Sequence, residues 1–129
     1  MPEPLPERVQ KTAAAIVDSA FKVHTALGPG LLESVYEACL VHELTKRGYA
    51  VRRQVVLPIV YEGLRLDDGL RLDLLVDDDV IVEIKAVERD APVFLAQVMT
   101  YLKLANKRLG LLINFNVHTI KDGIRRVAL

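Results

Sequence analysis

The sequence predicts an α/β domain with a central mixed sheet and helices on its faces. Apolar residues recur at helical spacing over residues 7–47, and the pattern then becomes β-branched and extended over residues 51–86. A third helical stretch follows at 92–107, and the apolar run "LGLLINF" after it has the character of a buried strand. The order helix, helix, strands, helix, strand is typical of sheets that are covered by helices.

The composition is that of one folded domain spanning residues 1–129, of which 51% are hydrophobic and 26% charged. Residues 1–6 hold three of the six prolines and are expected to form a loose arm. The start, "MPEPLPERVQ", lacks the basic-then-apolar order of a secretory signal, which favours a cytoplasmic location. Charges interrupt every apolar run well short of ~20 residues, so no membrane span is expected.

Seventeen basic and 17 acidic residues give a formal net charge of zero. A protein that coats nucleic acid is normally basic, so this balance excludes that class. Any contact with nucleic acid must therefore come from a local patch. The single cysteine, Cys39, lies in an apolar helical pattern and is expected to be a reduced core thiol. The three histidines share no ligand spacing, and His24 is interpreted as structural.

The first helix is predicted over residues 7–27, because "GPG" at 28–30 stops the pattern. The second is predicted over 31–47, with Gly48 as its C-terminal stop. The segment "VRRQVVLPIVYEG" is expected to be a strand, and Pro58 within it indicates an edge or a bulge. Turns are predicted at Glu62-Gly63 and at Asp67-Asp68-Gly69.

The strands "RLDLLV" and "VIVEIKA" are predicted to form a hairpin around Asp77-Asp78-Asp79. The third helix is expected to begin at Asp90-Ala91-Pro92, with the aspartate as its cap, and to run to about Lys107. Its expected core stripe is Leu95, Val98, Met99 and Leu102. The tail "IRRVAL" is a candidate for one more strand.

A three-residue hairpin loop pairs Val76 with Val80 and, counting back, Asp73 with Glu83. In this register one face is wholly apolar: it carries Leu72, Leu74, Val76, Val80, Val82 and Ile84. A loop of two or four residues would spoil that face. The register also opposes two carboxylates, which is destabilising unless something offsets the repulsion.

A divalent cation between Asp73 and Glu83 would provide that offset, because hard cations take oxygen ligands. Lys85 points to the same side and adds a positive charge. The alternative is that these charges are simply solvated on an open face. The three aspartates of the loop are a second candidate cation site, although acidic turns also form for local hydrogen-bonding reasons.

Glu33 and Gln97, which both fall in predicted helices, can each be interpreted in two ways. Glu33 falls in the first turn of the second helix, where it would complete a cap or interact with the helix dipole. It also shares a stripe with Tyr36, Glu37 and Leu40, which would aim it at the sheet. Gln97 either offers an uncharged hydrogen-bonding group near the strands or is a plain surface residue.

Two stretches together resemble a known family. "GLLESVY", residues 30–36, resembles the pattern that names the GxxExxY protein family. "RLDLLVDDDVIVEIKA", residues 71–86, resembles the Asp…Glu-x-Lys signature of the PD-(D/E)XK nuclease superfamily, in which that family is placed. The resemblance extends from about Ala13 to the C-terminus. One departure is that Leu72 precedes Asp73, where the signature begins with proline.

The resemblance implies a restriction-endonuclease-like core in the order α-β-β-β-α-β. It implies that Asp73 and Glu83 ligate Mg²⁺, for which Mn²⁺ can substitute, with help from the backbone carbonyl of Ile84. It further implies that Glu33 completes the metal shell, directly or through water. Lys85 would position or activate water, and Gln97 would lie near the active site.

These residues predict a Mg²⁺-dependent nuclease that acts on DNA in preference to RNA. Mg²⁺ is a Lewis acid and a template in phosphodiester hydrolysis, and Lys85 adds charge stabilisation. The alternative is a catalytically silent nuclease-like module that binds nucleic acid or protein. Seven basic residues are candidates for phosphate contacts: Lys46, Arg47, Arg52, Arg53, Lys103, Lys107 and Arg108. A homodimer would allow cuts in both strands, but no residue specifies one.

Overall fold

The computed structural model describes residues 3–129, which form three α-helices, one 3-10 helix and five strands. The elements in chain order are α1 (Glu7–Leu27), α2 (Glu33–Lys46), β1 (Val51–Tyr61), β2 (Leu64–Val76), β3 (Val80–Lys85), α3 (Pro92–Ala105), β4 (Leu109–Asn114), η1 (Ile120–Gly123) and β5 (Ile124–Ala128). The predicted first helix is confirmed with the same bounds. The second begins two residues later than predicted because Leu31 and Leu32 lie outside the helix.

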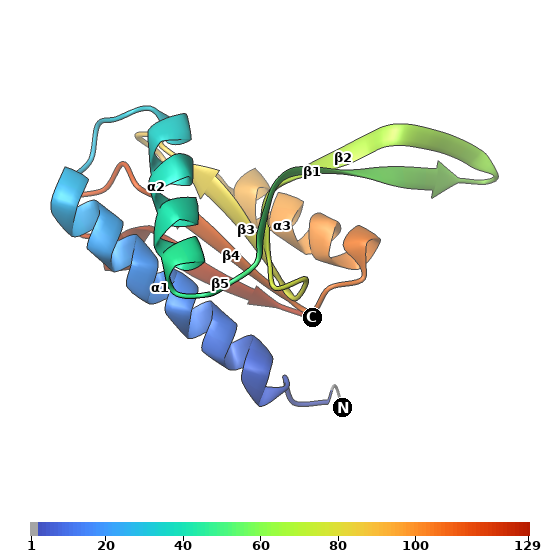
Figure 1. The fold of residues 1–129 in the computed structure, drawn as a ribbon. Helices are drawn as coiled ribbons and strands as arrows, with labels where there is room; N and C mark the ends of the chain where they lie inside the picture. Colours follow the sequence, from blue (N-terminus) through green and yellow to red (C-terminus); the bar gives the residue numbers. More distant parts are fainter. Residues whose placement is uncertain (1–2) are drawn as a thin grey trace.

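The five strands form one mixed sheet in the order β1-β2-β3-β4-β5. Only β3 and β4 run parallel, and α3 connects them. Helices α1 and α2 lie over one face of the sheet, and α3 lies on the other (Figure 1). This is the restriction-endonuclease-like α/β architecture that the sequence predicts, with helices burying both faces of the central strands.

Two apolar clusters follow from this layering. The first joins α1 and α2 to the sheet through residues such as Ile16, Tyr36 and Leu74. The second joins α3 to the opposite face through residues such as Val98 and Leu102. Tyr36 stacks on Phe115 in the first cluster, with their ring centroids 4.6 Å apart. The predicted core stripe of α3 is therefore correct for Val98 and Leu102.

Met99 is a correction to that stripe, because it is 41% exposed. The start of α3 also differs from the prediction. Its N-cap is Ala91, and the Asp90 carboxylate instead accepts a hydrogen bond from the Ala91 N–H and pairs with Arg125 at 2.9 Å. The carboxylate that was expected to cap the helix is thus engaged by Arg125, and Pro92 stands in the first turn as predicted.

The predicted hairpin register is confirmed. Backbone pairing joins Val76 to Val80, Leu75 to Ile81 and Leu74 to Val82 across a three-residue loop. Leu74, Val76, Val80, Val82 and Ile84 all lie in the first apolar cluster, as expected.

Leu72 is the exception, because it packs in the second cluster with Val55 and Leu70. The physical reason is a bend in the neighbouring strand. Gln54 of β1 stands opposite Asp73 and has a φ of 49°, a left-handed conformation that breaks the regular alternation of faces. Beyond this bend, the β1–β2 ribbon turns away and projects past α3 as an arm (Figure 1).

The arm contains the predicted bulge at Pro58 but not the predicted turn at Asp67-Asp68-Gly69. Residues 67–69 lie within β2 and stand opposite Pro58 alone, between the pairs Leu57–Leu70 and Ile59–Leu66. Proline has no backbone N–H, so an irregular edge strand accommodates it. The turn at the tip is Glu62-Gly63, as predicted, and both residues have positive φ.

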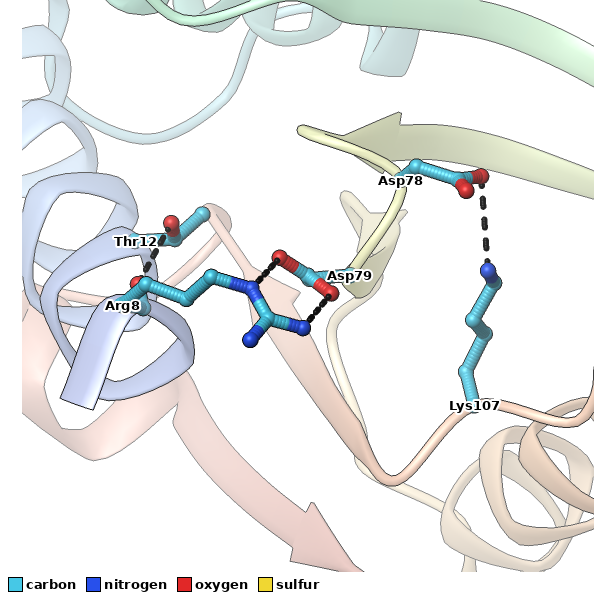
Figure 2. A network of polar contacts seen from close by, with 5 residues as sticks. All are labelled: Arg8, Thr12, Asp78, Asp79 and Lys107. Carbon is cyan, nitrogen blue, oxygen red and sulfur yellow. Dashed lines mark hydrogen bonds and ion pairs between the residues drawn. The ribbon is translucent and has the colours of Figure 1, made fainter. Parts of the chain in front are cut away.

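The three aspartates between β2 and β3 each bind a different protein group. Asp79 accepts two hydrogen bonds from Arg8, at 3.2 and 3.3 Å, and Asp78 pairs with Lys107 at 3.3 Å (Figure 2). The Asp77 carboxylate accepts the Ala50 N–H at 2.8 Å. Because each carboxylate binds a different part of the protein, the loop joins α1, the start of β1 and the segment after α3, and it is not a cation site.

The N-terminal segment, residues 1–6, was expected to be loose, but the part of it that the structure describes is anchored to the fold. Leu5 packs against the first apolar cluster, and the Arg108 guanidinium donates to the carbonyls of Glu3 and Pro4. Residues 1 and 2 of that arm lie outside the described residues. Between residues 3 and 129, none of the helices has the length and apolar character that crossing a membrane requires.

Candidate functional site

Asp73 and Glu83 stand where β2 and β3 separate. The Asp73 backbone N–H donates to Glu83 Oε2 at 2.8 Å, and the Ile84 N–H donates to Asp73 Oδ2 at 2.8 Å. Each carboxylate thus replaces a ladder bond that the diverging strands no longer make. Both side chains are fixed by the backbone of the opposite strand, which gives the site a defined geometry.

Burial makes this pair electrostatically unusual. Glu83 is only 3% exposed, and burial followed by the nearby charge of Asp73 raises its pKa to about 8. Burial also raises the pKa of Asp73, and the hydrogen bond from Ile84 opposes that rise. Two carboxylates in one weakly solvated place are hard to ionise together. The site therefore binds a proton or another cation more readily than ordinary surface carboxylates do.

Lys85 extends this group along β3 and is held by α3. Its Nζ lies 3.5 Å from Gln97 Oε1 and 4.8 Å from the centre of the Phe94 ring. The Gln97 amide in turn donates to the Tyr101 hydroxyl at 3.0 Å. Gln97 is thus half-buried and faces the strands, so the surface reading is wrong. Because its oxygen accepts from Lys85, it orients the ammonium without adding charge.

Glu33 begins α2 and is exposed, yet its charge interacts with the strand residues. Partial burial and then the charge of Asp73 raise the pKa of Glu33, while Lys85 lowers it. Glu33 is therefore close enough to Asp73 and Lys85 to feel both charges. The N-cap of α2 is Leu32 and no side chain caps the helix, so Glu33 completes no cap, but it does stand in the first turn, where the helix dipole favours a negative charge.

Glu37 is a buried carboxylate that the sequence did not single out. It is 7% exposed and lies one helical turn after Glu33, on the same stripe. Arg53 donates to its Oε2 at 2.9 Å and Gln54 to its Oε1 at 2.7 Å. Its charge contributes to the raised pKa of Asp73. The signal available in the sequence was the four-residue spacing from Glu33.

The donor set suits a hard divalent cation. Asp73 and Glu83 each use one oxygen in a backbone hydrogen bond, and among the described residues the second oxygen of each makes none. Across residues 3–129 no cluster of three or more His, Cys, Asp or Glu side chains is arranged to hold a metal ion. Mg²⁺ is commonly held by one or two carboxylates, with waters and phosphates completing its shell.

Most of the seven basic residues that were candidates for phosphate contacts bind other groups within the fold. Arg53 binds Glu37, Lys46 binds Glu43, Arg47 binds Asp18 and Lys107 binds Asp78. Arg108 is engaged with backbone carbonyls. A different cation, the exposed Arg71, is near enough to lower the pKa of Asp73.

The remaining candidates are structural. His24 is buried, and its Nε2 lies 2.8 Å from the Val117 carbonyl oxygen, which fixes η1 and the preceding loop to α1. Cys39 is a free, half-buried thiol that packs against the first apolar cluster.

Comparison with known proteins identifies one family. Residues 10–127 match the family model described as the PD-(D/E)XK nuclease superfamily. No curated protein and no solved structure gives a significant match to the chain. The match covers all the residues of the site, from Glu33 on α2 to Gln97 on α3.

Proposed function

We infer the function of this chain from its family: it belongs to the PD-(D/E)XK nuclease superfamily, and we propose that it is a Mg²⁺-dependent nuclease. The observation that carries the proposal is that four elements, β2, β3, α2 and α3, contribute side chains to one region. The buried pair Asp73–Glu83 lies on the strands, Lys85 is held next to it by Gln97, and Glu33 approaches from α2. The "GLLESVY" stretch further supports placing the chain in the GxxExxY family.

Asp73 and Glu83 would hold the cation through their second oxygens, with the Ile84 carbonyl and Glu33 completing its shell directly or through water. When bound, Mg²⁺ supplies Lewis-acid activation of a phosphoryl oxygen and of water. Mn²⁺ can take the same oxygen ligands, because both ions favour carboxylate and water. Mutual repulsion between the two carboxylates favours capture of a cation, since bound positive charge replaces the proton that burial otherwise retains.

Lys85 is the catalytic residue that this chain supplies beside the metal ligands. Its ammonium would stabilise negative charge that develops on the phosphate oxygens and would orient the attacking water. Gln97 and Phe94 fix the position of the ammonium, so little reorganisation is needed when charge develops. Gln97 therefore acts as a positioning residue through Lys85.

The proposed substrate is DNA, with RNA as the less favoured nucleic acid. Arg71 is the exposed cation near Asp73, and we expect it to contact a phosphate next to the scissile one. Each phosphate contact should contribute about −0.9 to the slope of log affinity against log salt on duplex DNA. Arg71→Ala should reduce that slope by about one contact. Arg126→Ala, which changes an exposed arginine on β5 that is not among the candidate phosphate contacts, is the matched control.

The test of the function is cleavage of labelled single-stranded, duplex and branched DNA and of RNA, with Mg²⁺ or Mn²⁺. Wild type, Lys85→Ala and the surface control Lys121→Ala would be assayed side by side, with folding checked by circular dichroism. Cutting that is kept in Lys121→Ala and lost in Lys85→Ala supports the proposal and identifies the substrate. Equal cutting by all three proteins would contradict the assignment of Lys85.

The second candidate is a catalytically silent module that binds nucleic acid or protein. It is favoured by the neutralised basic patch and by the formal net charge of zero. In that case wild type would bind Mg²⁺ but cut nothing, and a stably folded Lys85→Ala protein would keep its function in the cell. We propose a cytoplasmic location for the protein under both candidates.

A further inference from the structure

A buried hydrogen-bonded network joins α2 to the bend of β1. Its centre is Glu37, which is 7% exposed and accepts from two consecutive residues of the strand. Arg53 donates to one carboxylate oxygen at 2.9 Å, and the Gln54 side-chain amide donates to the other at 2.7 Å. Hydrogen bonds to a carboxylate are strong and directional, so the network joins the helix and the strand firmly.

The backbone of Gln54 is strained. Its φ is 49°, and among residues 3–129 it is the one residue other than glycine that has a positive φ inside a strand. A left-handed conformation is costly for a residue with a Cβ, so it persists only where the surroundings hold it. The hydrogen bond from Gln54 to Glu37 holds it here. Strain of this kind is typical of functional sites, where it fixes the position of other groups.

The network lies beside two of the proposed metal ligands. Gln54 stands opposite Asp73 in the register of β1 and β2. Glu37 lies one helical turn after Glu33, on the same stripe of α2. Burial is the main cause of the raised pKa of Asp73 and of Glu33, and the charge of Glu37 adds to both shifts. One side chain therefore links the helix that carries Glu33 to the strand next to Asp73.

We propose that Glu37 is a positioning residue for the metal ligands that the proposed function assigns, on which this role builds. It docks α2 against the bend of β1, and so it holds Glu33 near the Asp73–Glu83 pair. Outer partners of this kind orient metal ligands, and their loss typically weakens metal binding about 10- to 100-fold. Its negative charge acts in the same direction, because it adds to the attraction for a cation. Its own oxygens accept from β1, so it acts through the ligands and is not one itself.

Glu43→Gln is the matched control for Glu37→Gln. Glu43 is the other buried glutamate of α2: it is 8% exposed and pairs with Lys22 and Lys46. The two variants remove a buried charge from the same helix, so both should lower the urea midpoint, but only Glu37→Gln should change the metal site. Gln54→Gly is a third variant, because glycine accepts the left-handed φ while the amide is lost. Circular dichroism would confirm that all three proteins fold.

The first measurement is hydrogen exchange of the metal-free protein in EDTA. The Asp73 and Ile84 N–H groups donate to the carboxylates of the pair, so their exchange reports how firmly the pair is held. In Glu37→Gln and Gln54→Gly both amides should exchange at least about 10-fold faster than in Glu43→Gln. Equal rates in Glu37→Gln and Glu43→Gln would overturn the positioning role.

The second measurement is the affinity for Mg²⁺, determined by calorimetry without nucleic acid. Glu37→Gln and Gln54→Gly should weaken binding about 10-fold, whereas Glu43→Gln should stay within about two-fold of wild type. Equal weakening by Glu37→Gln and Glu43→Gln would also overturn the role. A wild type that binds no Mg²⁺ would contradict the proposed nuclease, and the exchange rates at Asp73 and Ile84 would still decide whether Glu37 positions the pair.

Discussion

Asp73 and Glu83 hold each other's strands through reciprocal bonds between one carboxylate and the backbone of the other strand. The Asp73 N–H binds Glu83 Oε2, and the Ile84 N–H binds Asp73 Oδ2, each at 2.8 Å. The backbone pairing of β2 and β3 ends at this point, so the two carboxylates accept the backbone hydrogen bonds that carbonyl groups accept elsewhere in the sheet. The arrangement fixes two like charges in a buried place, and several measurable properties depend on it.

Stability without metal should fall as the pH rises from about 5 to 8.5. The folded state raises the pKa of Glu83 from 4.5 to about 8, so it binds a proton that the unfolded chain has already released. The unfolding free energy therefore decreases with pH across that window. Urea unfolding in EDTA would measure this fall, and Glu83→Gln should flatten it. Added Mg²⁺ should stabilise more at pH 8 than at pH 6, and an inverted order would contradict the proposed ligands.

Gln97→Leu should lower kcat by about 10-fold and leave KM for DNA nearly unchanged, if the chain cuts DNA as proposed. The substitution removes the oxygen that accepts from Lys85 but keeps the side-chain volume close to the original. Steady-state kinetics would separate the two constants. Thr100→Ala, on the exposed side of the same helix, is the control. A rise in KM alone would assign Gln97 to substrate binding and not to positioning Lys85.

Arg53→Ala should destabilise the fold by about 1–3 kcal/mol, because the buried Glu37 carboxylate loses a charged donor. The value lies below that for fully buried pairs because the Arg53 side chain is 47% exposed. Arg65→Ala is a matched control, since its pair with Asp67 is exposed on both sides and should contribute under about 1 kcal/mol. Urea midpoints of the two variants provide the comparison, and equal midpoints would refute a special role for Glu37.

Gly69→Ala should loosen the arm, at a cost of about 1–3 kcal/mol. A Cβ at this position would collide with Ile59 Cγ1 and lie 2.6 Å from the Ile59 backbone nitrogen. Backbone cannot move aside as a side chain can, so the bulge itself must distort. Hydrogen exchange of arm amides would report the change. At Gly63 the φ of 83° and the open space predict that Gly63→Asn is tolerated.

The sequence predicted the features that depend on local periodicity. The bounds of α1 follow from apolar spacing and the glycines after it, and the hairpin register follows from keeping one face apolar. Both are short-range patterns that no distant residue overrides. The fold class follows from the order of these patterns, and the family match agrees with it.

The errors arose where a distant partner decides the local outcome. Asp90 looked like a helix cap, but Arg125 on β5 binds it. Asp67-Asp68-Gly69 has turn composition, yet Pro58 on the neighbouring strand makes it a bulge. Leu72 lies on the other side of the sheet because Gln54 bends β1, and a φ of 49° at glutamine has no sequence signature.

The candidate site was predicted from its strand residues more completely than from its helical ones. The spacing within one hairpin is enough to bring Asp73, Glu83 and Lys85 together. Glu37 was missed because its partners on β1, Arg53 and Gln54, are identified only once α2 is docked on the sheet. Docking a helix is a long-range event that a one-dimensional pattern does not specify.

The alternation of side chains along the arm limits how its length can vary among relatives. Adding one cross-strand pair beyond Tyr61 and Leu64 would place the new pair on the face of Val60 and Arg65, and adding two would return to the apolar face of Tyr61 and Leu64. Insertions that extend the apolar surface should therefore come as four residues, two in each strand, around an unchanged Glu62-Gly63 turn. Single-residue insertions would shift the strand register and move the paired leucines to the other face of the arm.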